Sequence, residues 1–240
     1  SMGVKPTSDW VFTVPGATID NPDSVKAATV LDQWTKAGYL PEGVNGIDGA
    51  TASGEFTKGT GYGSPAIAGE RLAFLHRLRG EEIVECLHAE TGATHWQFRY
   101  PTDFEDRYGY NDGPRVSPVI DGGRVYTVGA QGQLHCLDLE AGRVIWKHDL
   151  DKEYRVPQDF FGRSSTPLIE GPHLIISVGA PGGPCVVAFD KATGREVWRA
   201  GKEWGAGYAS PIPAVIHGQR RVFVFAGGES NPPTGGLMSI

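Results

Sequence analysis

Short runs of apolar residues, separated by turn residues, follow one another from about residue 60 to the end of the chain. Four of these runs open with Ser or Thr followed by Pro, at Ser64-Pro65, Ser117-Pro118, Thr166-Pro167 and Ser210-Pro211. A Gly-containing turn and a second apolar run come after each opening. Runs of about four to eight residues bounded by Gly and Pro are typical of β-strands. The pattern therefore predicts a pair of strands that recurs along the chain.

A longer motif follows the first three strand pairs, in the stretches Val84–Trp96, Leu134–Trp146 and Val186–Trp198. Each copy has a small residue, an apolar residue, a turn position, a Gly and then a Trp. The turn position carries Asp138 and Asp190 in two copies and His88 in the first, where we interpret the His as structural. An Asp accepts backbone N–H bonds within a turn, a Gly supplies a positive φ, and the Trp starts the returning strand. The motif predicts a third and a fourth strand joined by a tight turn.

Together these patterns predict a unit of four antiparallel strands, and the motif copies begin 50 and 52 residues apart. Such sheets cannot bury both faces alone, so units of this period pack face to face around an axis. We therefore predict an all-β fold, a β-propeller of four-stranded antiparallel blades with three complete blades and one partial blade. The blades are predicted at about 60–101, 113–150, 163–200 and 208–240, the last of them incomplete.

Residues 1–59 are less regular and are interpreted as an extension of strand, helix and loop before the propeller at 60–240. Ser24–Lys36 is the one short helix predicted, and Trp34 lies on its apolar face. Trp10–Val14 alternates like the Trp strands of the blades. Two completions follow: this strand closes the last blade and a four-bladed ring, or the chain is part of a seven- or eight-bladed parent. Uncovered blade faces in the second case would favour a homodimer.

Composition and charge argue against several classes of partner and of site. The net charge is −6 without a Lys/Arg run, which argues against nucleic acid. No apolar run approaches the roughly 18 residues of a transmembrane helix. The three cysteines form no CxxC and no vicinal pair, which argues against a zinc knuckle or a redox dithiol. Cys86 and Cys136 occupy the small-residue position of the motif, so we interpret them as small packing residues.

The Ser-Pro opening and the Ala-x-Asp-x-x-Thr-Gly-x-x-x-Trp frame give residues 60–240 a resemblance to the tryptophan-docking repeat of PQQ-like β-propellers. That family contains quinoprotein alcohol dehydrogenases and non-catalytic relatives such as the lipoprotein of the outer-membrane β-barrel assembly machine. The resemblance implies a periplasmic or otherwise extracytoplasmic location. The leading Ser1-Met2 resembles a cloning scar, so we expect that any native signal peptide was removed, and the sequence itself does not fix the compartment.

The resemblance also raises PQQ and Ca²⁺ as cofactors. In the family's quinone enzymes PQQ lies between a vicinal disulfide and a Trp, beside Ca²⁺ held by Glu, Asn and Asp. This sequence has no Cys-Cys pair and no evident acidic set of that kind, so its residues do not support either cofactor. Trp96, Trp146 and Trp198 all occupy docking positions and are predicted to be core residues.

The loops that lead into the innermost strand of each blade share one face of a propeller and surround its axis. Here they carry aromatic, polar and basic candidates for a binding rim: Tyr62, Tyr110, Asn111, Arg115, Phe161, Arg163, Ser164 and Tyr208. Such a mixture suits a peptide, a sugar or a carboxylate. The alternative is that these side chains seal the axial ends of the blades.

From these observations we expect a non-catalytic binding or scaffold protein that uses this face for a protein, peptide or carbohydrate partner. The alternative is a fragment of a PQQ-dependent alcohol or sugar dehydrogenase. The fold alone does not decide between them, because one fold supports many functions.

Overall fold

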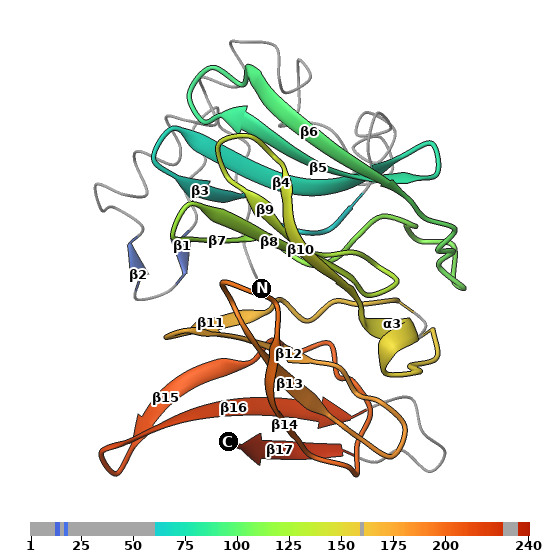
Figure 1. Cartoon of the computed structure of the whole chain (residues 1–240), viewed down its shortest axis with the longest axis vertical. Coiled ribbons are helices and arrows are strands. Elements are labelled where there is room, and N and C mark those ends of the chain that lie inside the picture. The colour runs from blue at the N-terminus through green and yellow to red at the C-terminus, as the bar shows by residue number, and fades with distance from the viewer. Residues whose placement is uncertain (1–12, 15–16, 19–60, 159–160, 228–234) are drawn as a thin grey trace.

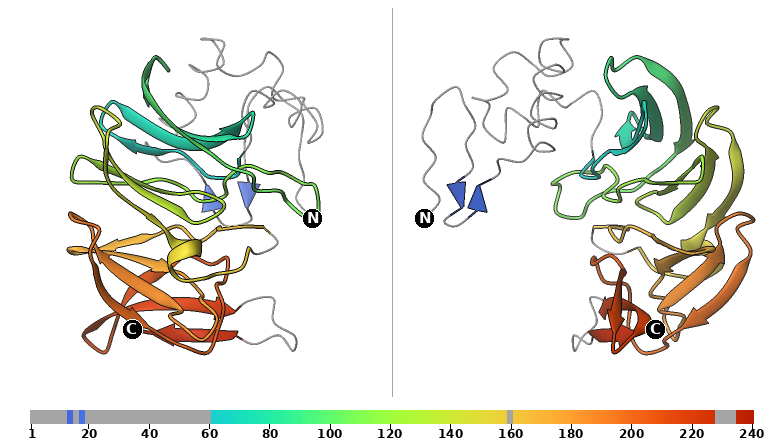
Figure 2. Two further views of the ribbon diagram at one scale, coloured as in Figure 1. Left: turned by 45° about the vertical axis from the view of Figure 1, so that its right-hand side comes forward. Right: turned by 90° about the vertical axis from the view of Figure 1, so that its left-hand side faces the viewer.

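The computed structural model describes residues 13–14, 17–18, 61–158, 161–227 and 235–240. Its sheets fan out about a common axis (Figures 1 and 2), and their innermost strands lie side by side, β3 next to β7 and β7 next to β11. Three of these sheets are antiparallel meanders of four strands and the fourth has three strands, and a separate two-stranded sheet precedes these four in the described part of the chain. The predicted all-β propeller architecture, with three complete blades and one partial blade, is confirmed.

The four sheets are named blades 1 to 4 in chain order. Blade 1 consists of β3 (Ala66–Ala68), β4 (Arg71–Leu78), β5 (Glu81–His88) and β6 (Thr94–Pro101). Blade 2 consists of β7 (Val119–Asp121), β8 (Arg124–Val128), β9 (Gln133–Asp138) and β10 (Val144–Asp149). Blade 3 consists of β11 (Leu168–Glu170), β12 (His173–Ser177), β13 (Val186–Asp190) and β14 (Glu196–Ala200). Blade 4 consists of β15 (Ile212–Ile216), β16 (Gln219–Gly227) and β17 (Gly235–Ser239).

The turn between the third and fourth strands forms as the motif predicts. Asp190 Oδ1 accepts hydrogen bonds from the Thr193 backbone N at 2.8 Å and from the Thr193 hydroxyl at 2.8 Å. In blade 1 the Nδ1 atom of His88 accepts from the backbone N of Glu90 at 3.2 Å. His88 therefore replaces the Asp as a turn acceptor, which confirms its structural interpretation.

Two of the three motif tryptophans, Trp96 and Trp146, dock on the following blade, and of the three predicted core residues only Trp146 is buried, whereas Trp96 and Trp198 are half-buried. Trp146 donates its Nε1–H to the Lys191 carbonyl at 3.1 Å, and its ring lies against Gly194, where a Cβ would approach to 2.7 Å. Trp96 repeats the arrangement with the Leu139 carbonyl, at 2.9 Å, and Gly142. Each of these glycines therefore provides both the positive φ of its turn and the space for an indole ring.

The strand register explains the small-residue position of the motif. Cys86, Cys136 and Ala188 are the cross-strand partners of Trp96, Trp146 and Trp198. Side chains of directly paired residues share one face of a sheet, so a small residue leaves room for the indole. All three cysteines are free and buried, and burial raises the pKa of the Cys136 thiol to about 11. Cys86 and Cys136 are packing residues, as predicted.

A chain of hydrogen bonds links the Ser/Thr-Pro openings of successive blades. The backbone N of Ser64 donates to the Ser117 hydroxyl at 2.9 Å, that of Ser117 to the Thr166 hydroxyl at 3.3 Å, and that of Thr166 to the Ser210 hydroxyl at 3.0 Å. We call this series the hydroxyl ladder. The residue after each hydroxyl is a Pro, which has no N–H to place in the sheet. The opening therefore joins blades to one another around the axis.

The hydrophobic core lies between the blades. Val84 and Leu137 belong to a cluster between blades 1 and 2, Tyr126 and Phe189 to one between blades 2 and 3. A third cluster, which includes Val224, joins blades 3 and 4. Most of the apolar burial therefore depends on contacts between blades, as expected for face-to-face packing.

The extension before blade 1 has two described strands, β1 (Thr13–Val14) and β2 (Ala17–Thr18), which pair with each other. In the described part of the chain β1 does not join blade 4, whose order is β15-β16-β17. The predicted helix at Ser24–Lys36 lies outside the described residues. The short helix α3 (Leu150–Glu153) was not predicted from the sequence, and Asp149 caps it by accepting a hydrogen bond from the Lys152 N at 3.2 Å. No helix among the described residues is long and apolar enough to cross a membrane.

Two buried ionisable residues between blades 1 and 2 respond to pH in opposite directions. His135 is 5% exposed, and its ring centroid lies 4.6 Å from that of Tyr100. Burial, and then Lys147, lowers the pKa of His135 to about 4. Glu82 is fully buried and accepts from the Ala130 N at 2.8 Å, and burial raises its pKa. On acidification the unfolded chain binds the histidine proton first, whereas the folded chain binds the Glu82 proton first.

We therefore expect His135→Phe to change how stability depends on pH. Between pH 6.5 and 4 the wild type should lose up to about 3 kcal/mol relative to the variant, because only its unfolded state gains the histidine proton there. Urea unfolding at pH 7, 5.5 and 4 measures the difference. Glu82→Gln is the control of opposite sign, and parallel curves for wild type and His135→Phe would contradict the expectation.

Candidate functional site

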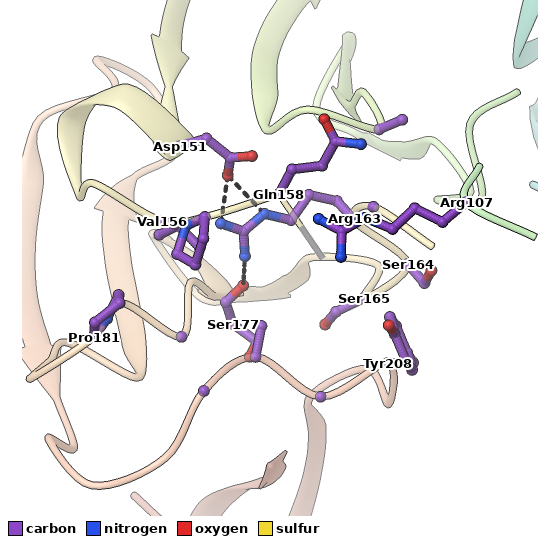
Figure 3. A pocket seen from close by; sticks show the side chains of 17 residues that line it. Arg107, Asp151, Val156, Gln158, Arg163, Ser164, Ser165, Ser177, Pro181 and Tyr208 are labelled. Atoms are coloured by element: carbon purple, nitrogen blue, oxygen red, sulfur yellow. Dashed lines mark hydrogen bonds and ion pairs between the residues drawn. The ribbon is translucent and has the colours of Figure 1, made fainter. Parts of the chain in front are cut away.

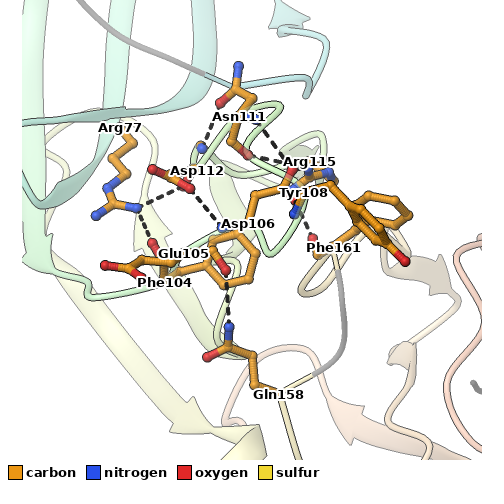
Figure 4. Close-up of polar contacts among 11 residues, drawn as sticks. Arg77, Phe104, Glu105, Asp106, Tyr108, Asn111, Asp112, Arg115, Gln158 and Phe161 are labelled. Atoms are coloured by element: carbon orange, nitrogen blue, oxygen red, sulfur yellow. Dashed lines mark hydrogen bonds and ion pairs between the residues drawn. The ribbon is translucent and has the colours of Figure 1, made fainter.

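The candidate site is formed by the loops that precede β3, β7, β11 and β15, which we call the leading loops. Arg77 of β4 fixes the leading loop of blade 2 by donating to the carbonyls of Phe104 and, at 3.1 Å, Asp112. Asp112 Oδ1 in turn accepts from the Asp106 N at 2.7 Å, as Figure 4 shows. This loop is therefore held in one shape by its own polar contacts.

Arg115 joins the leading loops of blades 2 and 3. It donates to Asp106 Oδ2 at 2.8 Å and to the Phe161 carbonyl at 2.9 Å (Figure 4). Burial opposes ionisation of Asp106, yet hydrogen bonds from the Tyr108 and Asn111 backbone N–H groups and from Arg115 hold its pKa below the usual value. Arg115 is therefore an ion-pair partner within the loop cluster.

Five aromatic side chains gather around Arg115, at least one from each leading loop: Tyr62, Tyr108, Tyr110, Phe161 and Tyr208. We call them the aromatic rim. The Arg115 guanidinium lies over the rings of Tyr62 and Phe161, 5.1 and 5.2 Å from their centroids. Phe161 contacts Tyr108 at 5.7 Å and Tyr208 at 5.6 Å between centroids. Tyr62 is 57% exposed and Tyr110 72%, so the rim presents ring surface to solvent.

Arg163 is a buried brace. Its Nε and Nη2 atoms donate to Asp151 Oδ1 at 2.9 and 2.5 Å, and Nη1 donates to the Val178 carbonyl at 2.6 Å. The residue is 8% exposed. Both candidate arginines are thus paired with an Asp inside the protein, which removes the reason to expect a carboxylate ligand from them.

The structure separates the candidates of the sequence analysis into two groups. Tyr62, Tyr110, Phe161 and Tyr208 lie on the aromatic rim, whereas Arg115, Arg163 and Asn111 stabilise the loops. Asn111 Oδ1 accepts from the Gly113 N at 2.7 Å. Ser164 lines a cavity beside the rim. Tyr108, which also belongs to the rim, was not among the candidates, although its neighbour Tyr110 was.

The cavity beside the rim has a volume of about 430 Å³ and lies between the leading loops of blades 3 and 4. Figure 3 shows Arg163 reaching to Asp151 along one wall, with Ser165, Ser177 and Tyr208 around the same space. Ser165 is 5% and Ser177 2% exposed, and neither hydroxyl has a hydrogen-bond partner among the described residues. Nothing in the sequence pattern distinguished these two serines.

The described residues do not fit the cofactors of the quinone enzymes. No group of three or more His, Cys, Asp or Glu side chains in the described part of the chain could hold a metal ion. The three cysteines are buried separately, and Trp96 and Trp146 are occupied in docking. No PQQ or Ca²⁺ site is therefore built from these residues.

Comparison with known proteins gives the family. The family model described as outer membrane protein assembly factor BamB matches residues 80–231, more than half of the chain. The chain belongs to this family. The matched range covers the third and fourth strands of blade 1, all of blades 2 and 3, and part of blade 4, which confirms the resemblance to PQQ-like propeller repeats.

Two curated relatives carry the same description. The relative from Xanthomonas campestris pv. campestris is 34% identical over 88 residues, which are 37% of this chain and 21% of that protein. The relative from Burkholderia pseudomallei is 29% identical over 143 residues, 58% of this chain and 34% of that protein. The chain thus spans about a third or less of the curated relatives it matches.

A solved quinohemoprotein alcohol dehydrogenase from Pseudomonas putida HK5 shares the fold. It is 17% identical, with a TM-score of 0.50 over 76% of this chain and 32% of its own. At this identity the likeness concerns the architecture and not the activity.

Proposed function

We propose that this chain is a non-catalytic scaffold of outer-membrane protein assembly that binds a protein partner through its aromatic rim in the periplasm. Membership of a family described as an outer-membrane protein assembly factor supports the role and the compartment. The observation that carries the choice of surface is the exposed aromatic cluster contributed by all four leading loops.

The physical character of the rim supports a protein partner. Aromatic side chains are enriched at protein interfaces because they bury a large area at a low cost in conformational entropy. The loops beneath the rings are braced by Arg115 and Asp106, so the rings are already in place before binding. A carbohydrate ligand and a homodimer have no support from the relatives, and we do not propose them.

A dehydrogenase role has weaker support. It rests on a shared fold at 17% identity, and the described residues form no cation or PQQ site. The non-catalytic role needs no such site.

The double variant Tyr62→Ala/Tyr110→Ala tests the proposal. Binding of a small outer-membrane β-barrel protein, unfolded in urea and diluted beside the immobilised chain, should weaken by about 10-fold or more, since interface aromatics are frequent hot spots. Stability should stay within about 1 kcal/mol, because both side chains are exposed.

Val144→Ala/Val197→Ala is the matched control, because both valines are similarly exposed but lie on blade strands away from the rim. It should bind the unfolded barrel protein within about twofold of the wild type. Equal loss in both double variants, or a wild type that does not bind, would overturn the proposal.

A further inference from the structure

The cavity beside the rim contains two unsatisfied hydroxyl groups. Ser165 precedes β11 and Ser177 ends β12, so both line the axial end of blade 3. A buried hydroxyl without a partner loses its hydration and gains nothing in return, so such groups are uncommon unless something binds them. These two hydroxyls therefore point to a ligand that donates or accepts a hydrogen bond inside the cavity.

Close backbone contacts fix the walls of this cavity. A Cβ on Gly179 would lie 1.8 Å from the Ala206 N, and one on Gly162 would lie 2.5 Å from the Ala130 carbonyl oxygen. Both glycines also have a positive φ. The loops of blades 2, 3 and 4 therefore meet backbone to backbone, and the space between them is defined before any ligand arrives.

The buried charge of the cavity wall is balanced, whereas Arg107 lines the cavity at its exposed edge. Arg163 is the buried cation of the wall, and Asp151 neutralises it through two hydrogen bonds. A charged ligand group placed deep in this cavity would lose its hydration without gaining a counter-charge. The buried end of the ligand should therefore be neutral and polar.

Apart from Gln158, Ser164 and the exposed Arg107, the remaining side chains of the lining are apolar or aromatic and continue the aromatic rim. Val156, Pro157 and Pro181 line the cavity, and Tyr208 lies at its edge, where it also contacts Phe161 of the rim. A ring entering from the rim would have aromatic contact at the mouth and aliphatic contact inside. A volume of about 430 Å³ lies within the range of small-ligand pockets, so it accommodates one large side chain.

We propose that this cavity binds the phenol side chain of a tyrosine from an extended segment of the protein partner, with its hydroxyl bonded to Ser165 or Ser177. This inference rests on the proposed function, and it names a tyrosine side chain as the part of the protein partner that the chain recognises. A phenol has an apolar ring that fits the apolar walls. It also has a neutral hydroxyl group that can form a hydrogen bond with one of the two unpartnered serines. Extended segments of outer-membrane barrels carry aromatic residues at both membrane interfaces, so suitable tyrosines are frequent in them.

Four synthetic peptides test the proposal. Each has ten residues that alternate between polar and apolar, with Tyr, Phe, Ala or Glu at one central position. The Tyr peptide should bind about 10-fold more tightly than the Ala peptide and several-fold more tightly than the Phe peptide, since the Phe ring leaves the buried serine hydroxyls without a hydrogen bond. Equal binding of Tyr and Phe peptides, or tightest binding of the Glu peptide through Arg107 at the exposed edge, would overturn it.

The variant Ser165→Ala/Ser177→Ala isolates the hydroxyl groups. It should fold at least as well as the wild type, because neither hydroxyl has a partner to lose among the described residues. It should bind the Phe peptide as before and lose the preference for Tyr. A preference that survives in this variant would contradict the assignment.

The two proposals fail in different ways. If all four peptides bind equally and Tyr62→Ala/Tyr110→Ala weakens them all, the rim is the binding surface and the cavity inference is wrong. If neither the peptides nor the unfolded barrel protein bind the wild type, both proposals are wrong.

Discussion

Replacing Arg163 with alanine is expected to lower the free energy of unfolding by about 3–5 kcal/mol. The change removes the guanidinium that makes two hydrogen bonds to Asp151, whose side chain is 18% exposed, and leaves the Val178 carbonyl without the Arg163 donor. Breaking a buried ion pair from one side is costly because the remaining charge is uncompensated. Urea unfolding followed by tryptophan fluorescence measures the loss.

Arg199→Ala is the matched control. Arg199 also makes two hydrogen bonds to one carboxylate, that of Glu196, but its side chain is 59% exposed. Its removal should cost less than about 1 kcal/mol. If Arg163→Ala is as mild as this control, Arg163 is not a brace, and its guanidinium becomes available as a binding group on the rim.

The second large effect is expected for Trp146→Ala, at about 3–5 kcal/mol. Trp146 is 9% exposed, packs on Gly194 of blade 3 and bonds the Lys191 carbonyl. Its removal leaves a cavity between two blades and takes away one of the three side-chain hydrogen bonds that the Lys191 carbonyl accepts, those from Arg124 and Tyr126 remaining. The lost contact area is therefore the main cost, and the lost hydrogen bond adds to it.

Trp198→Ala provides the comparison within the same repeat. Trp198 occupies the same motif position, but blade 4 has no Asp-x-x-Thr-Gly turn in this sequence, and Trp198 is only half-buried. Its replacement should cost about 1–2 kcal/mol less than that of Trp146. Equal losses would show that docking on the next blade's glycine contributes little, and the motif would need another explanation.

The blades could be predicted from sequence because every element of the motif acts locally or on an adjacent blade. The turn between Asp190 and Gly194 is closed by a hydrogen bond from the Gly194 N to the Asp190 carbonyl, so it depends only on neighbouring residues. The motif tryptophans recur at intervals of 50 and 52 residues, at positions 96, 146 and 198. Short-range turn chemistry and a repeated period are the two features that a single sequence displays directly.

The roles of the leading-loop residues could not be predicted in the same way. Arg115 and Tyr62 are separated by 53 positions, and only the packing of blades 1 and 2 places the guanidinium over the ring. Arg163 pairs with Asp151, which lies on a four-residue helix that no sequence pattern predicts. The sequence therefore shows which aromatic and charged residues the leading loops contain, but the partner of each side chain is set by the tertiary fold.

The hydroxyl ladder bears on how proteins of this architecture evolve. Blades 2 and 3 each contribute one backbone donor and one hydroxyl acceptor at the same Ser/Thr-Pro opening, so both are bonded to the preceding and to the following blade by the same chemistry. A duplicated blade inserted between two others would bring both the backbone donor and the hydroxyl acceptor that it needs to bond with its neighbours. Gene duplication could therefore lengthen or shorten the series of blades without requiring compensating mutations at the axis.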